Sequence, residues 1–104
     1  MDQRKLVRDR IPERIQSNGH TCSYHIADTD EYWMALKAKL LEEVNEVVAA
    51  ETDDDLKEEL ADLLEVIDTL IEIKGMSAGQ IHRRKREKGI EVGRFQSRII
   101  LDSY

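Results

Sequence analysis

Apolar side chains recur at helical spacing in the middle of the chain, between residues 31 and 50. Five of them fall within one narrow arc when each residue turns the helix by about 100°. They are Trp33, Leu36, Leu40, Val44 and Val47. Thr29 or Asp30 is placed to cap the first turn, and the polar run ETDDD follows Ala50. The pattern predicts a long helix over about 31–50.

A second periodic segment follows over about 56–74. Its main apolar stripe consists of Leu56, Leu60, Leu63, Leu64, Ile67 and Ile71, and it is widened by Val66, Leu70 and Ile73. Asp53 or Asp54 can cap its start, and Gly75 is a suitable stop. The apolar arc covers roughly half of the helix circumference, which is more than a surface helix of a monomer requires. We therefore expect this helix to pack on two sides, with a partner subunit on one of them.

Shorter elements are expected on both sides of the long helices. IPERIQ, with Pro12 in its first turn, predicts a short helix that SNG ends, and residues 20–27 predict a short strand or an extended connector. A Ser77 cap predicts another helix over about 78–88, after which Gly89 and Gly93 open an irregular segment. The final FQSRIILDSY is expected to be a strand or an extended tail.

These elements together predict an all-α fold. A chain of 104 residues with one proline and five glycines suits one domain rich in helices. The short ETDDD connection requires the two long helices to run antiparallel. We expect a helical bundle of two long antiparallel helices plus shorter helices over residues 1–104, assembled with a partner subunit.

Charge and cysteine usage restrict the class of protein. The net charge of −6 disfavours nucleic acid and anionic membranes as partners. Cys22 is the single cysteine, so no intrachain disulfide can form. The N-terminal MDQRKLVRDRIPERI lacks the apolar region of a signal peptide, and no apolar run is long enough to span a bilayer. We expect a cytoplasmic protein.

Acidic residues lie on the margin of both apolar stripes. Relative to Leu40, Glu43 lies roughly 60° to one side and Glu46 roughly 120° to the same side, whereas Glu42 points further away. On the second helix, Glu59 and Asp62 are one turn apart and interrupt the apolar arc. Antiparallel packing would bring these acids to face Glu43 and Glu46 across a groove.

Four partly buried carboxylates repel one another and are costly to desolvate. No lysine or arginine is expected at an adjacent position to neutralise them, so a hard divalent cation, Mg²⁺ or Mn²⁺, would do so. The histidines, His20, His25 and His82, lie elsewhere, which disfavours iron or zinc. In a chain with 37% charged residues, acid pairs at this spacing also occur on solvated helix faces. Geometry alone leaves both interpretations open.

The order of these acids resembles a known family. EEVNE (Glu42 to Glu46), then twelve residues, then ELAD (Glu59 to Asp62) resembles the E-E-x-x-E…E-x-x-D signature of the all-α MazG superfamily of nucleoside triphosphate pyrophosphohydrolases. KLVRDRIPERI and EELADLLEVIDTL are similar to its small phosphoribosyl-ATP pyrophosphohydrolase-like branch. KREKGIEVGRF is similar to that branch's K-x-x-x-R-G-G-F segment, but carries an insertion.

The resemblance implies Mg²⁺-dependent hydrolysis between the α and β phosphates of a nucleoside triphosphate or related nucleotide, giving a monophosphate and pyrophosphate. House-cleaning of non-standard nucleotides is one role of this kind. The implied metal ligands are Glu43, Glu46, Glu59 and Asp62, and the implied catalytic residues are Glu42, Glu43 and Glu46. Glu42 would support the ligands or orient water. The family also implies a homodimer or homotetramer.

Local cations are needed for an acidic protein to bind an anionic nucleotide. The candidates for phosphate contact are Lys5, Arg8, Arg10, Lys85, Lys88 and Arg94, with ordinary surface charge as the alternative. A non-catalytic helical module that binds nucleotide or regulates by oligomerising is the rival function, to be separated by binding without product. DNA binding through RRKREK ranks last, because that run lacks interleaved aromatic residues.

Overall fold

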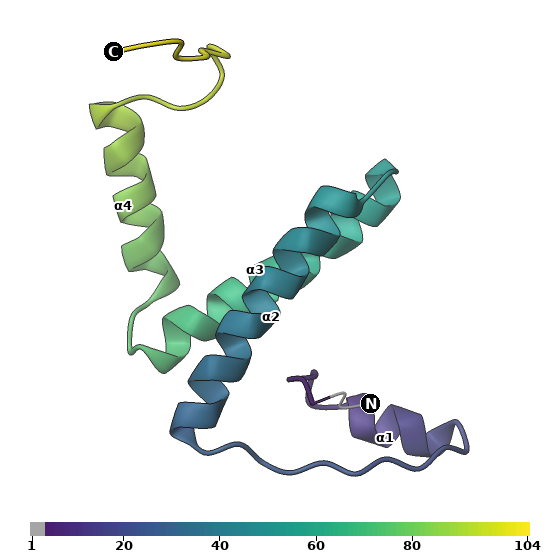
Figure 1. Ribbon diagram of the computed structural model, residues 1–104. Helices are drawn as coiled ribbons and strands as arrows, with labels where there is room; N and C mark the ends of the chain where they lie inside the picture. The colour runs from purple at the N-terminus through teal and green to yellow at the C-terminus, as the bar shows by residue number, and fades with distance from the viewer. Residues whose placement is uncertain (1–3) are drawn as a thin grey trace. The chain divides into compact units, whose positions relative to one another are not determined.

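The structure, a computed structural model, describes residues 4–104. Within that range it contains helices only, as Figure 1 shows: α1 (Ile11–Ser17), α2 (Thr29–Ala49), α3 (Asp53–Ile73) and α4 (Ala78–Glu91). The prediction of an all-α fold is confirmed. The strand options for residues 20–27 and for the tail are wrong, because both segments lack a neighbouring strand with which to pair.

The chain divides into two compact units, and the boundary falls inside α3 between Ile67 and Asp68. The first unit holds α1, α2 and the larger part of α3. The second holds the last turns of α3, then α4 and the tail. No helix in the described part of the chain combines the length and the apolar character that crossing a membrane requires.

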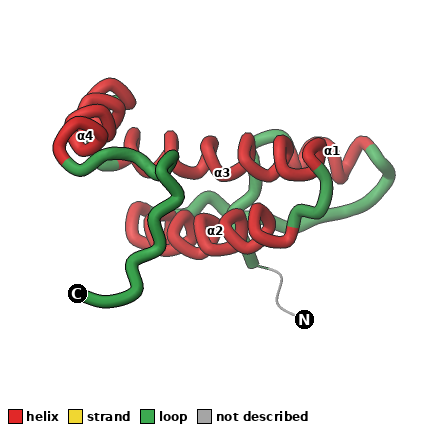
Figure 2. Tube along the Cα trace, turned by 90° about the horizontal axis from the view of Figure 1, so that it is seen from above, coloured by secondary structure: helices red, strands yellow, loops and turns green. Residues whose placement is uncertain are grey.

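In the first unit, α2 and the first part of α3 lie side by side and run in opposite directions (Figures 1 and 2). Leu36 is only 1% exposed and Val66 is also buried, so the centre of the packed face lies on these residues. Leu60 and Leu64 stay exposed although both belong to the predicted stripe. The apolar arc of α3 is therefore wider than the surface that this chain covers.

The start of α2 differs slightly from the prediction. Asp28, in an extended conformation, is the N-cap, and its carboxylate accepts a hydrogen bond of 2.9 Å from the amide of Glu31. Thr29 and Asp30 instead form the first turn, so their predicted capping role is wrong. The capping carboxylate must come from the last non-helical residue, which is one position earlier than the periodicity suggested.

The start of α3 shows the same kind of difference. Thr52 Oγ1 accepts a hydrogen bond of 3.1 Å from the amide of Asp55, and the Thr52 carbonyl accepts one of 2.9 Å from the amide of Leu56. Asp53 and Asp54 lie within the first helical turn and do not cap it. Their negative charges still interact favourably with the positive end of the helix dipole.

The ends of α3 and α4 follow the predicted signals in part. Gly75, with a φ of +71°, follows the end of α3 as predicted. Ser77 caps α4 in a capping box with Gln80. Gly89, however, lies inside α4, which continues to Glu91.

Thr52→Ala should lower the free energy of unfolding by about 1 kcal/mol, because the first turn of α3 loses its cap. Thr52→Ser keeps the hydroxyl and should restore most of that loss. Urea denaturation followed by circular dichroism measures both. Equal stability of Thr52→Ala and the parent would contradict this role.

Candidate functional site

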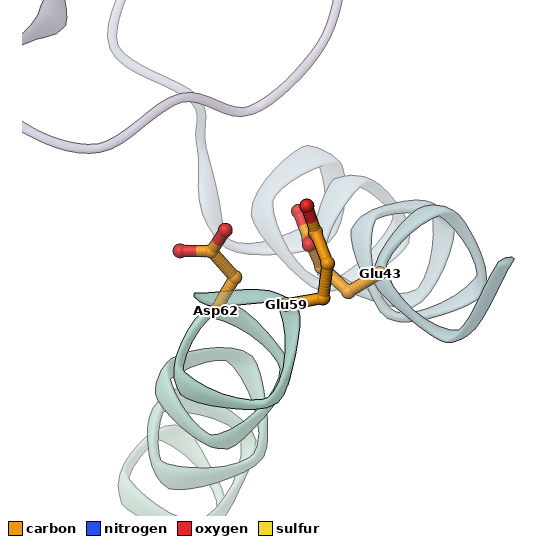
Figure 3. A group of neighbouring side chains, drawn as sticks. All are labelled: Glu43, Glu59 and Asp62. Carbon is orange, nitrogen blue, oxygen red and sulfur yellow. The ribbon is translucent and has the colours of Figure 1, made fainter. Parts of the chain in front are cut away.

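Three carboxylates from the two long helices meet in the first unit. Glu43 comes from α2, and Glu59 and Asp62 come from successive turns of α3. One oxygen of each lies within 4.8 Å of the others. Figure 3 shows the three side chains extending to the same side of the helix pair. The predicted juxtaposition of acids from two antiparallel helices is present for these three residues.

Glu43 is the buried member of this acid cluster, with an exposed fraction of only 6%. Its Oε1 lies 3.5 Å from Lys39 Nζ, while its Oε2 has no hydrogen-bond partner in the described part of the chain. A buried carboxylate oxygen without a partner costs stability, because it loses the hydrogen bonds that water would supply. That oxygen is therefore available to a ligand.

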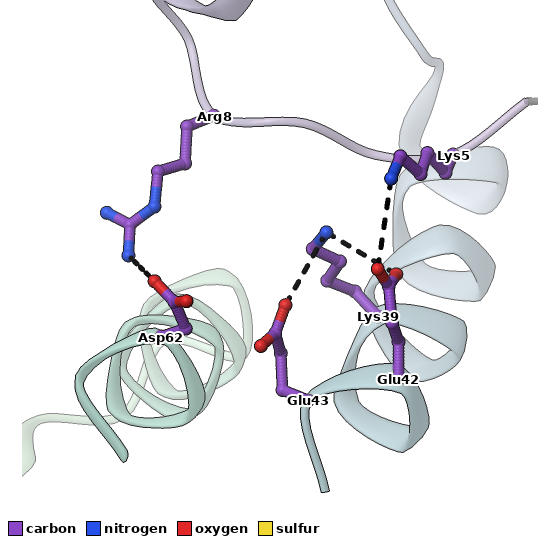
Figure 4. Close-up of polar contacts among 6 residues, drawn as sticks. All are labelled: Lys5, Arg8, Lys39, Glu42, Glu43 and Asp62. Atoms are coloured by element: carbon purple, nitrogen blue, oxygen red, sulfur yellow. Dashed lines mark hydrogen bonds and ion pairs between the residues drawn. The ribbon is translucent and has the colours of Figure 1, made fainter. Parts of the chain in front are cut away.

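Basic side chains neutralise part of the cluster, contrary to the expectation that none would be adjacent. Lys39 Nζ lies 3.4 Å from Glu42 Oε2, in addition to its contact with Glu43. Arg8 Nη2 donates a hydrogen bond of 2.8 Å to Asp62 Oδ1. Figure 4 shows these contacts together with that of Lys5, whose Nζ lies 3.9 Å from Glu42 Oε1.

The contacts of Lys39 can be recognised in the sequence, whereas that of Arg8 cannot. Lys39 precedes Glu42 and Glu43 by three and four positions, which is the ordinary spacing of helical ion pairs and could have been found. Arg8 is 54 positions from Asp62, so no local pattern links them.

Glu46 is exposed and does not belong to the three-residue group. Because the helices are antiparallel, moving from Glu43 to Glu46 along α2 moves towards the start of α3. There Glu46, Asp55 and Glu59 line an open pocket of about 250 Å³. Glu46 therefore borders the cluster on one side.

Glu59 lies where desolvation and several neighbouring carboxylates act on the same group. Partial desolvation, followed by the negative charges of Glu46, Asp62, Glu43 and Asp55, raises the pKa of Glu59 above its ordinary value of 4.5. A carboxylate with a raised pKa is a better proton acceptor once ionised, and such shifts are common at functional sites.

The remaining predicted phosphate contacts lie elsewhere. Arg10 is 3.5 Å from Glu13 at the start of α1 and does not contact the acids. Lys85 and Lys88 are exposed on α4, and Arg94 is exposed in the tail, all in the second unit. Lys5 and Arg8 are thus the two predicted cations that contact the acidic residues.

The donor atoms of the cluster suit a hard divalent cation. All three are carboxylate oxygens, and no histidine or cysteine joins them among residues 4–104. Oxygen-only donor sets favour Mg²⁺, Mn²⁺ or Ca²⁺ over zinc. The unpartnered Glu43 Oε2 supplies an independent reason for a cation at this point. The residues present therefore fit a metal of this class.

Comparison with known proteins decides the family. The family model described as the MazG nucleotide pyrophosphohydrolase domain matches residues 33–92, which is more than half of the chain. The chain belongs to this family. The matched MazG region contains Lys39 and the whole acid cluster, whereas Lys5 and Arg8 lie outside it. Proteins of this family are nucleotide pyrophosphohydrolases, so membership supports hydrolase activity for this chain at a coarse level.

An uncharacterized protein of Mycolicibacterium smegmatis (strain ATCC 700084 / mc(2)155) is 56% identical to this chain over 50 residues. The similar region covers 48% of this chain and 51% of that protein, so the match spans about half the length of the relative. No solved structure shows significant similarity.

Removing the charge of Glu59 should stabilise the metal-free protein near neutral pH. Its raised pKa means that the folded state binds the Glu59 proton more tightly than the unfolded state does. Glu59 therefore favours folding less as pH rises through its folded pKa.

In a chelator, the melting temperature of Glu59→Gln should exceed that of the parent at neutral pH, and the difference should shrink below pH 4.5, the ordinary pKa of this group. Differential scanning calorimetry measures this, with Glu58→Gln, an exposed acid on the same helix, as the control. A difference independent of pH would contradict the assignment.

Proposed function

We propose that this protein hydrolyses a nucleoside triphosphate, or a related nucleotide, between the α and β phosphates in a Mg²⁺-dependent reaction. The products would be a nucleoside monophosphate and pyrophosphate. The observation that carries the proposal is the unpartnered, buried Glu43 Oε2 beside Glu59 and Asp62, within a MazG domain. Clearance of non-standard nucleotides is a physiological role that fits this chemistry.

The metal ligands proposed are Glu43, Glu59 and Asp62, with Glu46 joining from the margin. When bound, Mg²⁺, or Mn²⁺ in its place, would offset the phosphate charge and activate water for attack on phosphorus. Glu43 is the best preorganised of the four, because burial and the Lys39 contact restrict its side chain. Glu46 is exposed, so its side chain could turn towards the metal without displacing packed neighbours.

Proton transfer is assigned to a carboxylate near the attacking water. Glu46 is the candidate, because it lies outside the three-residue group and lines the pocket beside Glu59, so its carboxylate is the one least committed to the metal. Glu42 faces Lys39 and Lys5, so we propose that it acts by holding these lysines rather than by accepting the proton.

Phosphate binding is proposed for Lys5 and Arg8, which already lie beside the acids. A guanidinium or ammonium group at this position would bind the phosphate oxygens as charge-assisted donors. Arg10, Lys85, Lys88 and Arg94 remain proposed contacts of the same kind.

Asp62→Asn and Glu43→Gln should each lower kcat/KM roughly 100-fold or more, because each removes a ligand charge. Glu58→Gln on the exposed side of α3 is the matched control and should keep its activity. Pyrophosphate release from a panel of canonical and modified NTPs and dNTPs with Mg²⁺ is the measurement.

The parent protein decides between the two functions considered. Pyrophosphate release that requires Mg²⁺ supports the hydrolase. Calorimetric binding of nucleotide without any product would instead favour the non-catalytic nucleotide-binding module. Absence of product together with absence of metal binding would refute the proposed reaction.

A homodimer or homotetramer is proposed as the working state. Met34, Leu41 and Val48 recur every seventh residue on α2, so they form one line on the side opposite Leu36 and Glu43. Leu41 and Val48 are 67% and 80% exposed. On α3, Leu60 and Leu64 are also exposed. Exposed apolar residues arranged in a line of this kind are typical of a protein interface.

Leu41→Glu or Val48→Glu should shift the protein towards monomer, because burying a carboxylate in an apolar interface is costly. Thr21→Glu, at an exposed polar position outside the helices, adds the same charge and should leave the mass unchanged. Light scattering coupled to size-exclusion chromatography measures the mass. A parent protein that elutes as a monomer at all concentrations would contradict the proposal.

A further inference from the structure

Two kinds of basic side chain contact the acidic residues of the site. Lys39 lies on α2, one turn from the acids it contacts, and its side chain is only 19% exposed. Arg8 lies in residues 4–10, the N-terminal arm that precedes α1. Its side chain is 57% exposed, and that of its partner Asp62 is 42% exposed. Lys39 is therefore a fixed counter-ion, whereas Arg8 reaches the cluster from outside the helix pair.

Residues 5–8 of the arm contact the acids of the helix pair through ion pairs. In the described part of the chain, residues 5–8 make no backbone hydrogen bond to α2 or α3. Their contacts with the acids are the Arg8–Asp62 pair at 2.8 Å and the longer Lys5–Glu42 pair at 3.9 Å (Figure 4). Half-exposed ion pairs are weak, because water solvates both partners well once they separate. The Arg8–Asp62 pair can therefore be exchanged at low cost.

Two positively charged groups would compete for the Asp62 carboxylate, namely the Arg8 guanidinium and a divalent cation. The Arg8 guanidinium occupies Oδ1, and Asp62 is also one of the three acids that can share a cation. A cation at the cluster would repel the guanidinium while attracting a polyphosphate. The planar fork of arginine suits phosphate oxygens as well as carboxylate oxygens. The freed Arg8 would thus have a new partner within reach.

We propose that Arg8 is an exchangeable counter-ion, which neutralises Asp62 in the metal-free protein and transfers to a phosphate group when a divalent cation takes Asp62. The proposal rests on the metal site of the proposed function. It has two linked consequences. Arg8 lowers the affinity of the cluster for a cation alone, and it raises the affinity of the cation-loaded protein for a polyphosphate. The arm thereby makes binding of the cation and of the polyphosphate cooperative.

The decisive variant is Arg8→Gln, which removes the charge at an exposed position. Titration calorimetry with Mn²⁺ alone should give a dissociation constant about two- to fivefold tighter than that of the parent. Titration of inorganic pyrophosphate into protein saturated with Mn²⁺ should give binding roughly tenfold weaker, because a charge-assisted hydrogen bond is lost. The two affinities should thus change in opposite directions.

Two further variants isolate the cause. Arg14→Gln removes the same charge from an exposed position on α1 that is not among the proposed phosphate contacts, so both affinities should stay close to those of the parent. Arg8→Lys keeps the charge without the planar fork and should fall between the parent and Arg8→Gln in both titrations. Thermal unfolding checks that each variant is folded.

Unchanged affinities in Arg8→Gln, or changes in the same direction, would overturn the exchange while leaving the metal site intact. Equal effects of Arg14→Gln and Arg8→Gln would also overturn it, because the result would then reflect net charge alone. If the parent binds no Mn²⁺, the metal site of the proposed function fails, and the exchange fails with it.

Discussion

The carboxylate of Glu43 is buried at the packed face of α2, where water cannot fully solvate it. Lys39, one turn earlier on the same helix, forms an ion pair with one of its oxygens. The other oxygen has no hydrogen-bond partner in the described residues. An apolar residue at this position would remove that cost. The acid is therefore difficult to explain by stability, and we propose that a cation that needs an oxygen ligand accounts for it. The positions of Glu59 and Asp62 across from it follow from the antiparallel packing of α3.

The charge balance of the site differs from that of the whole chain. The protein carries a net charge of −6, yet the acids of the site are contacted by a lysine on α2 and by two cations of the N-terminal arm. This arrangement lets an acidic protein keep several carboxylates close together without a metal. We propose that it also supplies donors for the phosphates of an anionic ligand. The match to the MazG family covers the helices that carry the acids and does not include the arm.

The exposed apolar residues of α2 lie away from the acid site. The exposed line on α2 lies on the side of the helix opposite Leu36 and Glu43. One side of α2 thus holds the acid site, and the other is free to pack against a second copy. The proposed interface would also account for the part of the apolar arc of α3 that this chain leaves exposed.

Much of this protein was determined by local sequence. The two long helices follow from apolar residues at helical spacing. Gly75 marks the end of α3 and Ser77 the start of α4 through local backbone and capping geometry. The facing acids Glu43, Glu59 and Asp62 follow from the same period, once a short connection forces two helices to be antiparallel. The caps Asp28 and Thr52 were each missed by one or two residues, because periodicity does not mark the last non-helical residue.

Only the tertiary structure decided which groups complete the site. The helical period gave Glu43 and Glu46 similar status, but the way α2 packs on α3 buries the first and leaves the second at the margin. Arg8 reaches Asp62 over a separation of 54 residues, a contact that no short-range pattern encodes. The reason is that periodicity fixes the direction of a side chain relative to its own helix axis, whereas burial and long-range ion pairs depend on where other segments of the chain lie.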